Sequence, residues 1–383
     1  MQVHKGLDGV VVSETKISAI VDNQLLFAGY NIDELVAKEV LFEEVIYLLW
    51  YLQAPNGEEL QKFKDDLYAQ MPISDTIITC LKIQTHENLH PMSVLRSTIS
   101  LLGVFDPESE ETTQEAFYNQ SLALQAKIPT IIAAYSRLRR GLDPIPPKQD
   151  GTELAANFLY MLTGEEPGDM QVKGMNQALV LHADHDFNAS TFTARVCSST
   201  LSDVYSCITA AIGSLKGPLH GGANEKVFDM LNEIATGDLS VEAYLDQKLD
   251  RKEKVMGFGH RVYKIEDPRK KHLKKLAQEL TTATDRQQWY FLSCQIEQYL
   301  KEKKGLIPNV DFYSATVYHC LNIDSDLFTM LFAMSRVSGW LGHVSEQKIE
   351  DCLIRPRSLY VGEKHAFYPV VDAGGLKQGG LEA

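Results

Sequence analysis

The sequence contains no run of about 18 uncharged apolar residues, the length that a membrane-spanning helix needs. Its opening residues, MQVHKGLDGVVVSE, have no apolar stretch that ends in a small-residue cleavage site, so we expect no secretory signal. The six cysteines are scattered and form no Cys-x-x-Cys pair. In a chain of 383 residues this pattern is typical of reduced, mostly buried thiols, and we expect a cytoplasmic protein with no membrane partner.

Positive charge is also scarce, because the chain carries a formal net charge of −14. General nucleic-acid binding needs a basic surface, so the composition argues against it. The exception is the segment 251–275, which holds ten Lys/Arg and only three Asp/Glu. A basic segment in an acidic protein favours a small anionic ligand. A solvated helix face is the alternative, but the glycines, His260 and the turn at Asp267-Pro268 within the segment favour the ligand.

Helical periodicity dominates the chain. Apolar residues recur at spacings of three and four over 33–52, a run that we expect Pro55 and Gly57 to end. The same period recurs in the segments 58–71, 93–105, 116–141 and 152–164. Strand patterns are confined to the first 30 residues, at 10–12, 15–21 and 24–30. The sequence therefore predicts an all-α protein with a minor N-terminal β element.

Two clusters rich in Gly and Pro divide this helical pattern. One lies around 215–225, in GSLKGPLHGGANEKV, and the other is KGLIPNVD at 304–311. Such clusters between helices mark hinges or ligand loops. We therefore predict a large helical domain formed by 1–215 and 323–383, with a smaller helical domain, 216–322, inserted in it.

The first cluster contains GPLHGGANE, in which His220 precedes a predicted helix. The helix dipole disfavours a positive imidazolium there, which leaves a neutral histidine able to donate one hydrogen bond. Pro218 fixes the approach of the chain, and two glycines allow the backbone to come close to a ligand. The alternative is a structural histidine beside a glycine turn.

The basic segment contains VMGFGHRVYK at 255–264. A Gly-x-Gly loop followed by His260, Arg261 and Lys264 offers backbone donors, a proton donor and cations suited to phosphate. Arg269 follows the turn at Asp267-Pro268 and is suited to bind a carboxylate through two of its guanidinium nitrogens. A basic surface turn is the alternative.

A single acidic residue, Asp311, stands among apolar and aromatic neighbours in PNVDFYS. Burial would raise its pKa and make it a usable base. The alternative is a helix N-cap, the commonest role of an aspartate just before a helix.

The segment HADHD places His182 and His185 three residues apart, which on a helix puts them on one face. With Asp184 and Asp186 they could bind a metal, but no second cluster with ligand spacing closes such a site, so we expect no metal. A pair of core histidines is the alternative.

Arginines occur in two further motifs, Arg336 in MSRVSGW and Arg355 in RPRSLY. An arginine in apolar surroundings must be paired with an anion. Surface placement is the alternative for Arg355 and Arg357.

Together these motifs resemble the citrate synthase family. LHADHDFNAST, GPLHGGANE, GFGHRVYKIEDPR, PNVDFYSA, SRVSGW and RPRSLY stand in the family's order and at its approximate spacing. The openings KGLDGVVVSETKIS and GYNIDELV are similar to the shorter bacterial members. The resemblance covers nearly the whole chain and implies a two-domain, nearly all-helical subunit that forms a homodimer with a shared active site.

The resemblance also implies an activity and its residues. The activity is a Claisen-type condensation of acetyl-CoA with oxaloacetate and water, which yields citrate and CoA without a tightly bound cofactor. The implied catalytic residues are His220, His260 and Asp311. The implied oxaloacetate ligands are His185, His260, Arg269, Arg336 and, from the partner subunit, Arg355. The implied CoA contacts are Val255, Met256, Gly257, Phe258, Gly259, Arg261 and Lys264, the last replacing an arginine found in some members.

Three alternatives remain open at this stage. A 2-methylcitrate synthase would use the same fold and mechanism with propionyl-CoA. A metal-dependent phosphohydrolase would be built on His182, His185 and Asp186. A non-enzymatic helical scaffold would leave the basic segment and the histidines of the glycine loops unexplained.

Overall fold

The computed structural model describes residues 3–7, 9–85, 89–259, 263, 266–364, 371–372 and 375–376. The chain forms two units. One unit consists of Met1–Glu14 and Ile354–Ala383 and contains a 3₁₀ helix, Lys5–Leu7, and the short antiparallel strands β4 (Val371–Asp372) and β5 (Gly375–Leu376). The other unit, Thr15–Leu353, is the body of the protein.

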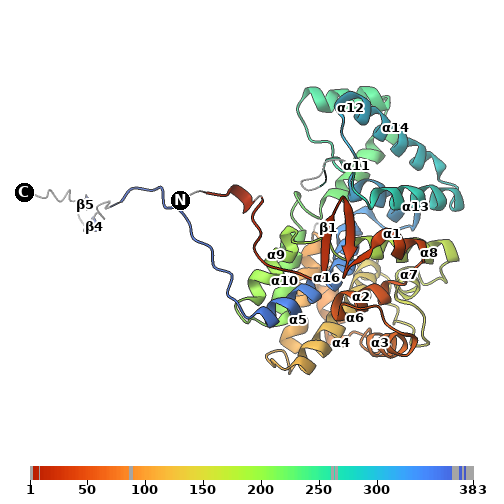
Figure 1. Cartoon of the computed structure of the whole chain (residues 1–383). Coiled ribbons are helices and arrows are strands. Elements are labelled where there is room, and N and C mark those ends of the chain that lie inside the picture. The colour runs from red at the N-terminus through yellow and green to blue at the C-terminus, as the bar shows by residue number, and fades with distance from the viewer. Residues whose placement is uncertain are drawn as a thin grey trace, which may run out of the picture. The chain divides into compact units, whose positions relative to one another are not determined.

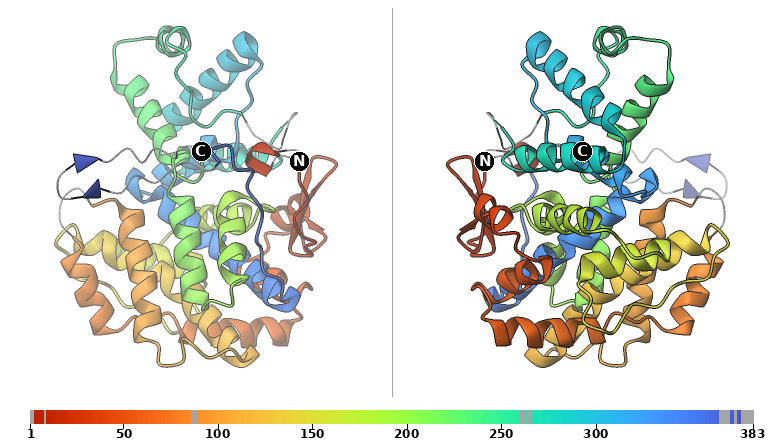
Figure 2. Two further views of the ribbon diagram at one scale, coloured as in Figure 1. Left: turned by 90° about the vertical axis from the view of Figure 1, so that its left-hand side faces the viewer. Right: turned by 90° about the vertical axis from the view of Figure 1, so that its right-hand side faces the viewer.

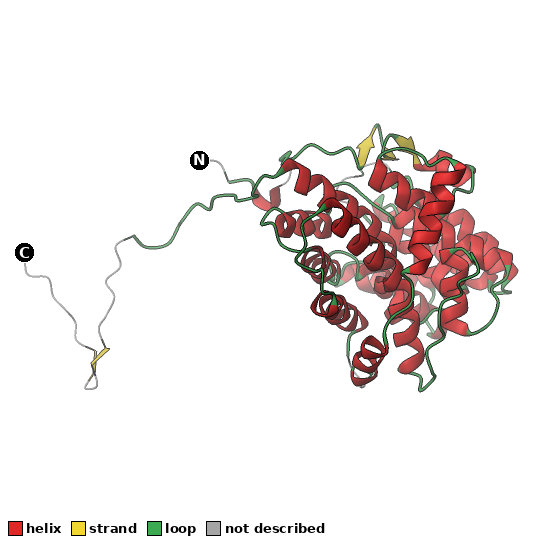
Figure 3. Ribbon diagram, turned by 90° about the horizontal axis from the view of Figure 1, so that it is seen from below, coloured by secondary structure: helices red, strands yellow, loops and turns green. Residues whose placement is uncertain are grey.

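The body is mostly helical, as predicted (Figures 1 and 3). Its helices are α1 (Ile32–Ala37), α2 (Phe42–Tyr51), α3 (Gly57–Ala69), α4 (Asp75–Ile83), α5 (Pro91–Phe105), α6 (Gln114–Leu138), α7 (Leu154–Thr163), α8 (Asp169–His182), α9 (Ala189–Ser198), α10 (Val204–Leu215), α11 (Ala223–Thr236), α12 (Val241–Asp250), α13 (Lys270–Ala283), α14 (Gln287–Lys304), α15 (Val310–Cys320) and α16 (Phe328–Glu350). No helix in the part of the chain that the structure describes is long and apolar enough to cross a membrane.

The minor β element is a three-stranded antiparallel ribbon of β1 (Ser18–Val21), β2 (Gln24–Phe27) and β3 (Tyr30–Asn31). Asp22 and Asn23 both have positive φ, the conformation that a tight hairpin turn requires. The strand expected at 10–12 is wrong, because these residues form no strand. Val11 is 89% exposed, so this apolar run lacks the buried face that would make it a strand.

The single helical run expected over 33–52 is two helices, α1 and α2. The Asn31 side chain caps the start of α1, and Glu39, with φ of 51°, turns the chain out of the helix after Lys38. The side chain of Glu44 then accepts a hydrogen bond from the N–H of Leu41 at the start of α2. Apolar spacing continues through the break because both helices pack on one core, which is why periodicity alone did not reveal it.

Helix α16 lies among the other helices of the body (Figure 2). It is buried over most of its length. It contacts α2, α6, α8, α9 and α10. A helix surrounded in this way is largely apolar where it is buried, and its buried polar residues must find specific partners. Three residues of α16, Arg336, Gly339 and His343, determine the geometry described below.

Helices α11, α12, α13 and α14 gather at one end of the body (Figure 1, top). They all belong to the segment 216–322 that the sequence predicts as the smaller domain. Their neighbour α15 contacts α11, α13 and α14, and also α8. The domain boundaries at 215 and 323 remain a prediction.

Candidate active site

His220 lies in the turn between α10 and α11, three residues before α11 begins. Its N–H donates to the carbonyl of Gly217, and the N–H of Gly221 donates to the carbonyl of Leu215. A Cβ on Gly221 would lie 2.9 Å from that same Leu215 carbonyl, so the turn needs glycine there. The structure thus gives His220 the position that the sequence predicts.

The imidazole of His220 is neutral and has a defined tautomer. Burial, together with the nearby guanidinium of Arg336, lowers its pKa to about 4. The backbone N–H of Ser190 donates to Nε2 over 3.3 Å, and Ser190 Oγ lies 2.8 Å from the same atom. Because Nε2 accepts a hydrogen bond, the proton of the neutral ring belongs on Nδ1. Burial, rather than the helix dipole alone, therefore keeps this histidine a neutral donor.

Asp311 lies in the first turn of α15 and is buried. The N-cap of this helix is Asn309, whose side chain accepts the N–H of Asp311 over 3.0 Å, so Asp311 is not the cap. Burial raises the pKa of Asp311 to about 7. Its Oδ1 has no hydrogen-bond partner among the described residues. A buried carboxyl with a pKa near neutrality and an unused oxygen has the properties of a general base.

Arg336 is a buried cation without an ion pair in the described part of the chain. Its Nε donates to the carbonyl of His182 over 2.8 Å, and its guanidinium lies 4.6 Å from the centre of the Phe332 ring. Its Nη2 is buried and has no partner among the described residues. Burial lowers the pKa of Arg336 to about 10, which still leaves it charged at neutral pH. Such a group is suited to a carboxylate ligand.

Arg269 is also buried, but it is paired with Asp267. Its Nε and Nη2 donate to the two carboxylate oxygens of Asp267 over 2.9 and 2.8 Å. Asp267 also accepts the N–H of Val310 over 3.0 Å, which ties Arg269 to the start of the helix that bears Asp311. Sequence reasoning treated Asp267 only as part of a turn. The Asp-x-Arg spacing was the signal that could have indicated this pair.

The expectation that His182 and His185 share a helix face is wrong. Helix α8 ends at His182, and His185 lies in the loop that follows. Nδ1 of His182 lies 2.7 Å from the carbonyl of Ala178, whereas Nε2 of His185 lies 3.0 Å from the hydroxyl of Tyr263. Nowhere in the described residues do three or more His, Cys, Asp or Glu side chains gather in a way that could hold a metal ion.

The predicted CoA loop, Val255, Met256, Gly257, Phe258 and Gly259, lies against the residues that precede α15. The N–H of Gly259 donates to the carbonyl of Ile307, and that of Asn309 donates to the carbonyl of Gly257, both over 2.9 Å. Gly257 has φ of 80°, and a Cβ there would lie 2.6 Å from Cγ2 of Val227. The chain can adopt this path only with glycine.

The structure does not place four of the predicted site residues at this site. His260, Arg261 and Lys264 lie outside the described residues. Arg355 is exposed and belongs to the unit that includes Ile354–Ala383. Their assigned roles remain predictions.

Four of the buried polar atoms that lack partners among the described residues belong to residues of this site. They are His182 Nε2, Asp311 Oδ1, Tyr318 Oη and Arg336 Nη2. The His182 ring centre lies 5.0 Å from that of Phe332 and 6.2 Å from that of Tyr318, and the His220 ring lies 6.4 Å from that of Phe332. Buried polar atoms normally have partners, so such a cluster indicates a polar ligand.

Sequence reasoning missed Tyr318 and assigned His182 only to a metal or core pair. Tyr318 follows Asp311 by seven residues, which is two helical turns, and so lies on the same face of α15. That spacing was the available signal for Tyr318.

Comparison with known proteins agrees with this geometry. A family model described as citrate synthase, C-terminal domain, matches residues 6–357. The chain belongs to the citrate synthase family. Citrate synthase 2 of Bacillus subtilis (strain 168) is 52% identical over 373 residues, which cover 97% of this chain and 100% of the relative. The family also contains a 2-methylcitrate synthase of Mycobacterium tuberculosis (strain H37Rv), 41% identical and covering 96% of this chain and 92% of the relative.

Solved structures of the family have the same fold. A ternary complex of citrate synthase from Thermoplasma acidophilum with carboxymethyl coenzyme A and oxaloacetate matches with a TM-score of 0.90 and 30% identity, covering 97% of this chain and 99% of that one. Citrate synthase from Thermotoga maritima matches with a TM-score of 0.84 and 37% identity, covering 96% and 98%. Membership of this enzyme family excludes the scaffold alternative, and it leaves the phosphohydrolase without support.

Proposed function

We propose that the chain condenses acetyl-CoA with oxaloacetate and water to give citrate and CoA. The observation that carries the proposal is the cluster of a neutral buried histidine, a carboxyl with a pKa near 7 and a buried guanidinium without an ion pair. The reaction requires a base, a hydrogen-bond donor and a group that binds an anion, and Asp311, His220 and Arg336 provide these. The type of reaction follows from membership of the citrate synthase family.

In the proposed mechanism Asp311 removes a proton from the methyl group of the thioester. The resulting enol or enolate oxygen accepts a hydrogen bond from Nδ1–H of His220, and such a donor is worth about 3–4 kcal/mol of barrier. The new carbon–carbon bond forms at the ketone of oxaloacetate, whose oxygen takes a proton from His260. Water then cleaves the thioester and releases CoA. No step needs a metal or a tightly bound cofactor.

The two carboxylates of oxaloacetate would be held by Arg336, Arg269 and His185, with Arg355 supplied by a partner subunit. The orphaned Nη2 of Arg336 supports its role most directly. The loop 255–259, with Arg261 and Lys264, would bind the CoA nucleotide. These assignments follow the family's motifs position by position.

The second candidate is 2-methylcitrate synthesis from propionyl-CoA, since the family contains both activities. One extra methylene changes selectivity by only about 1–3 kcal/mol, or roughly 10–200-fold. We expect kcat/KM for acetyl-CoA to exceed that for propionyl-CoA by about tenfold or more with saturating oxaloacetate, measured by release of free thiol. A preference for propionyl-CoA would instead identify the chain as a 2-methylcitrate synthase.

We also propose a cytoplasmic homodimer in which Arg355 completes the partner's site. Mixed dimers of Arg355→Ala and Asp311→Ala subunits should then regain part of the activity that each variant lacks, because one of their two sites carries neither change. Activity of a purified, doubly tagged heterodimer tests this. A verified heterodimer that stays inactive would contradict the shared site.

A further inference from the structure

We propose that Asp184, which we assigned no role in binding or catalysis, is a positioning residue for oxaloacetate. With Ser18 and His343 it fixes the loop that carries His185, and it supplies a negative charge near Arg336. This inference rests on the proposed function, since it names oxaloacetate as the ligand.

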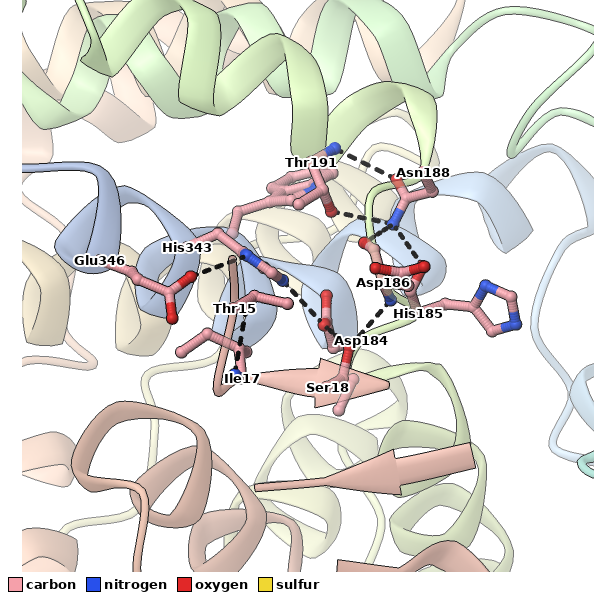
Figure 4. Close-up of polar contacts among 12 residues, drawn as sticks. Thr15, Ile17, Ser18, Asp184, His185, Asp186, Asn188, Thr191, His343 and Glu346 are labelled. Atoms are coloured by element: carbon pink, nitrogen blue, oxygen red, sulfur yellow. Dashed lines mark hydrogen bonds and ion pairs between the residues drawn. The ribbon is translucent and has the colours of Figure 1, made fainter. Parts of the chain in front are cut away.

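The first support is the set of contacts around Asp184 (Figure 4). Its Oδ2 accepts the hydroxyl of Ser18 on β1 over 2.5 Å and lies 3.0 Å from Nε2 of His343 on α16. Because a carboxylate can only accept, Nε2 of His343 carries a proton and donates it. The hydroxyl of Ser18 in turn accepts the N–H of Asp186 over 2.8 Å. His185 therefore lies between two residues that are anchored to the same serine.

The His185 imidazole points away from this cluster (Figure 4). Figure 4 shows the ring pointing away from Asp184, Ser18 and His343. The ring instead contacts Tyr263, which belongs to the segment predicted to bind CoA and oxaloacetate. The Ser18 and His343 contacts hold the backbone of the loop, and the His185 side chain points away from them. This is the arrangement expected when one set of residues positions a ligand-binding side chain.

The second support is charge. Asp184 and His343 are both fully buried. The imidazole of His343 and the guanidinium of Arg336 hold the pKa of Asp184 below its usual range, so it is ionised at neutral pH. Among the groups near Arg336, Asp184 is the carboxylate that most favours its charged form. Asp184 thus favours the charged form of Arg336 before an anionic ligand arrives.

The third support is steric. The N–H of Gly339 on α16 donates to the carbonyl of Ala183 over 3.2 Å. A Cβ at position 339 would lie 2.3 Å from Oδ1 of Asp184 and 2.7 Å from that carbonyl. The loop is therefore pressed against the helix that bears Arg336, and a displacement of Asp184 must move His185 relative to Arg336.

The test is Asp184→Asn, compared with Asp186→Asn as a matched control. Asp186 lies two residues away and is half-buried, but its carboxylate is not part of the Ser18–His343 cluster. We expect Asp184→Asn to raise the KM and the calorimetric Kd for oxaloacetate about tenfold or more, the size of effect usual for loss of a residue that orients a ligand-binding side chain. The KM of Asp184→Asn for acetyl-CoA at saturating oxaloacetate should stay near the wild-type value. The Asp186→Asn variant should bind oxaloacetate like wild type.

A merely structural role predicts a different result, namely a lower melting temperature or fewer active sites with an unchanged Kd for oxaloacetate. An Asp184→Asn protein that is folded and binds oxaloacetate like wild type overturns the inference. If that variant does not fold, Ser18→Ala decides in its place, because it removes both the contact to Asp184 and the contact to the N–H of Asp186. Wild-type protein that condenses neither acyl-CoA would instead contradict the proposed function.

Discussion

Replacing Asp311 with asparagine is expected to lower kcat by about 1,000-fold while oxaloacetate binding stays close to wild type, because a positioned base contributes about 10²–10⁴-fold. The amide keeps the size of the carboxyl but cannot take a proton from the thioester. Asp311 is assigned to the base and not to oxaloacetate, so calorimetry with oxaloacetate should show little change. A variant that retains about a tenth of the wild-type kcat would exclude Asp311 as the base.

The pH dependence of the wild type is part of the same prediction. Asp311 acts as a base only when ionised, and its pKa is raised to about 7. The value of kcat/KM should therefore fall about tenfold per pH unit below about pH 7. The matched control is Asp186→Asn, since burial also raises the pKa of Asp186. It should keep both kcat and the pH profile.

The stability of the Asp311→Asn variant gives an independent check on folding. The folded chain retains the Asp311 proton up to about pH 7, whereas the ordinary pKa is 3.8. The folded state thus binds more protons between these values, so this group makes folding less favourable as pH rises from about 4 to 7. Above about pH 7 the Asp311→Asn substitution removes a buried negative charge. The melting temperature of the variant should therefore not fall below that of wild type.

Replacing His220 with glutamine should lower kcat by about 100- to 1,000-fold, the usual effect of removing one donor to a developing oxyanion. The loss should appear in kcat more than in KM, because the hydrogen bond strengthens as charge develops on the thioester oxygen. Steady-state kinetics with acetyl-CoA at saturating oxaloacetate measures both values.

His319→Gln is the control for this substitution. His319 also has its pKa lowered to about 4 by burial, but it packs against Phe228 and Trp289, with ring centres 4.8 and 4.5 Å away. The His319→Gln variant should have a lower melting temperature than wild type and a nearly unchanged kcat. Equal losses of kcat in the two variants would mean that His220 acts only through packing.

Local patterns were sufficient to predict the helical class, the ribbon near the N-terminus and the turn that carries His220. Glycine and proline at 217–222 force that turn, so its position follows from sequence. The break between α1 and α2 did not follow, because apolar spacing continues through Glu39. The loop placement of His185 was also missed, since i, i+3 spacing suggests a helix unless the contacts that end α8 are known.

Most contacts that support the site could not be predicted from the sequence. Asp184 and Ser18 are 166 residues apart and Asp184 and His343 are 159 apart, so no local pattern connects them. Arg269 and Asp267 are close in sequence, yet the burial that makes their pairing necessary comes from tertiary structure. Motifs thus predicted the reacting groups, whereas the contacts that hold the described ones are mostly long-range.

Asn309 joins two parts of the proposed site through a single residue. Its N–H and its Nδ2 bind the carbonyls of Gly257 and Gly259, while its Oδ1 receives the N–H of Asp311. Under the proposed function, the loop 255–259 that binds the nucleotide is therefore coupled to Asp311, the base that removes the proton. An acyl group presented on a short thiol, without the nucleotide, would then react with a lower kcat and not only a higher KM, because remote binding energy would no longer help to align the base.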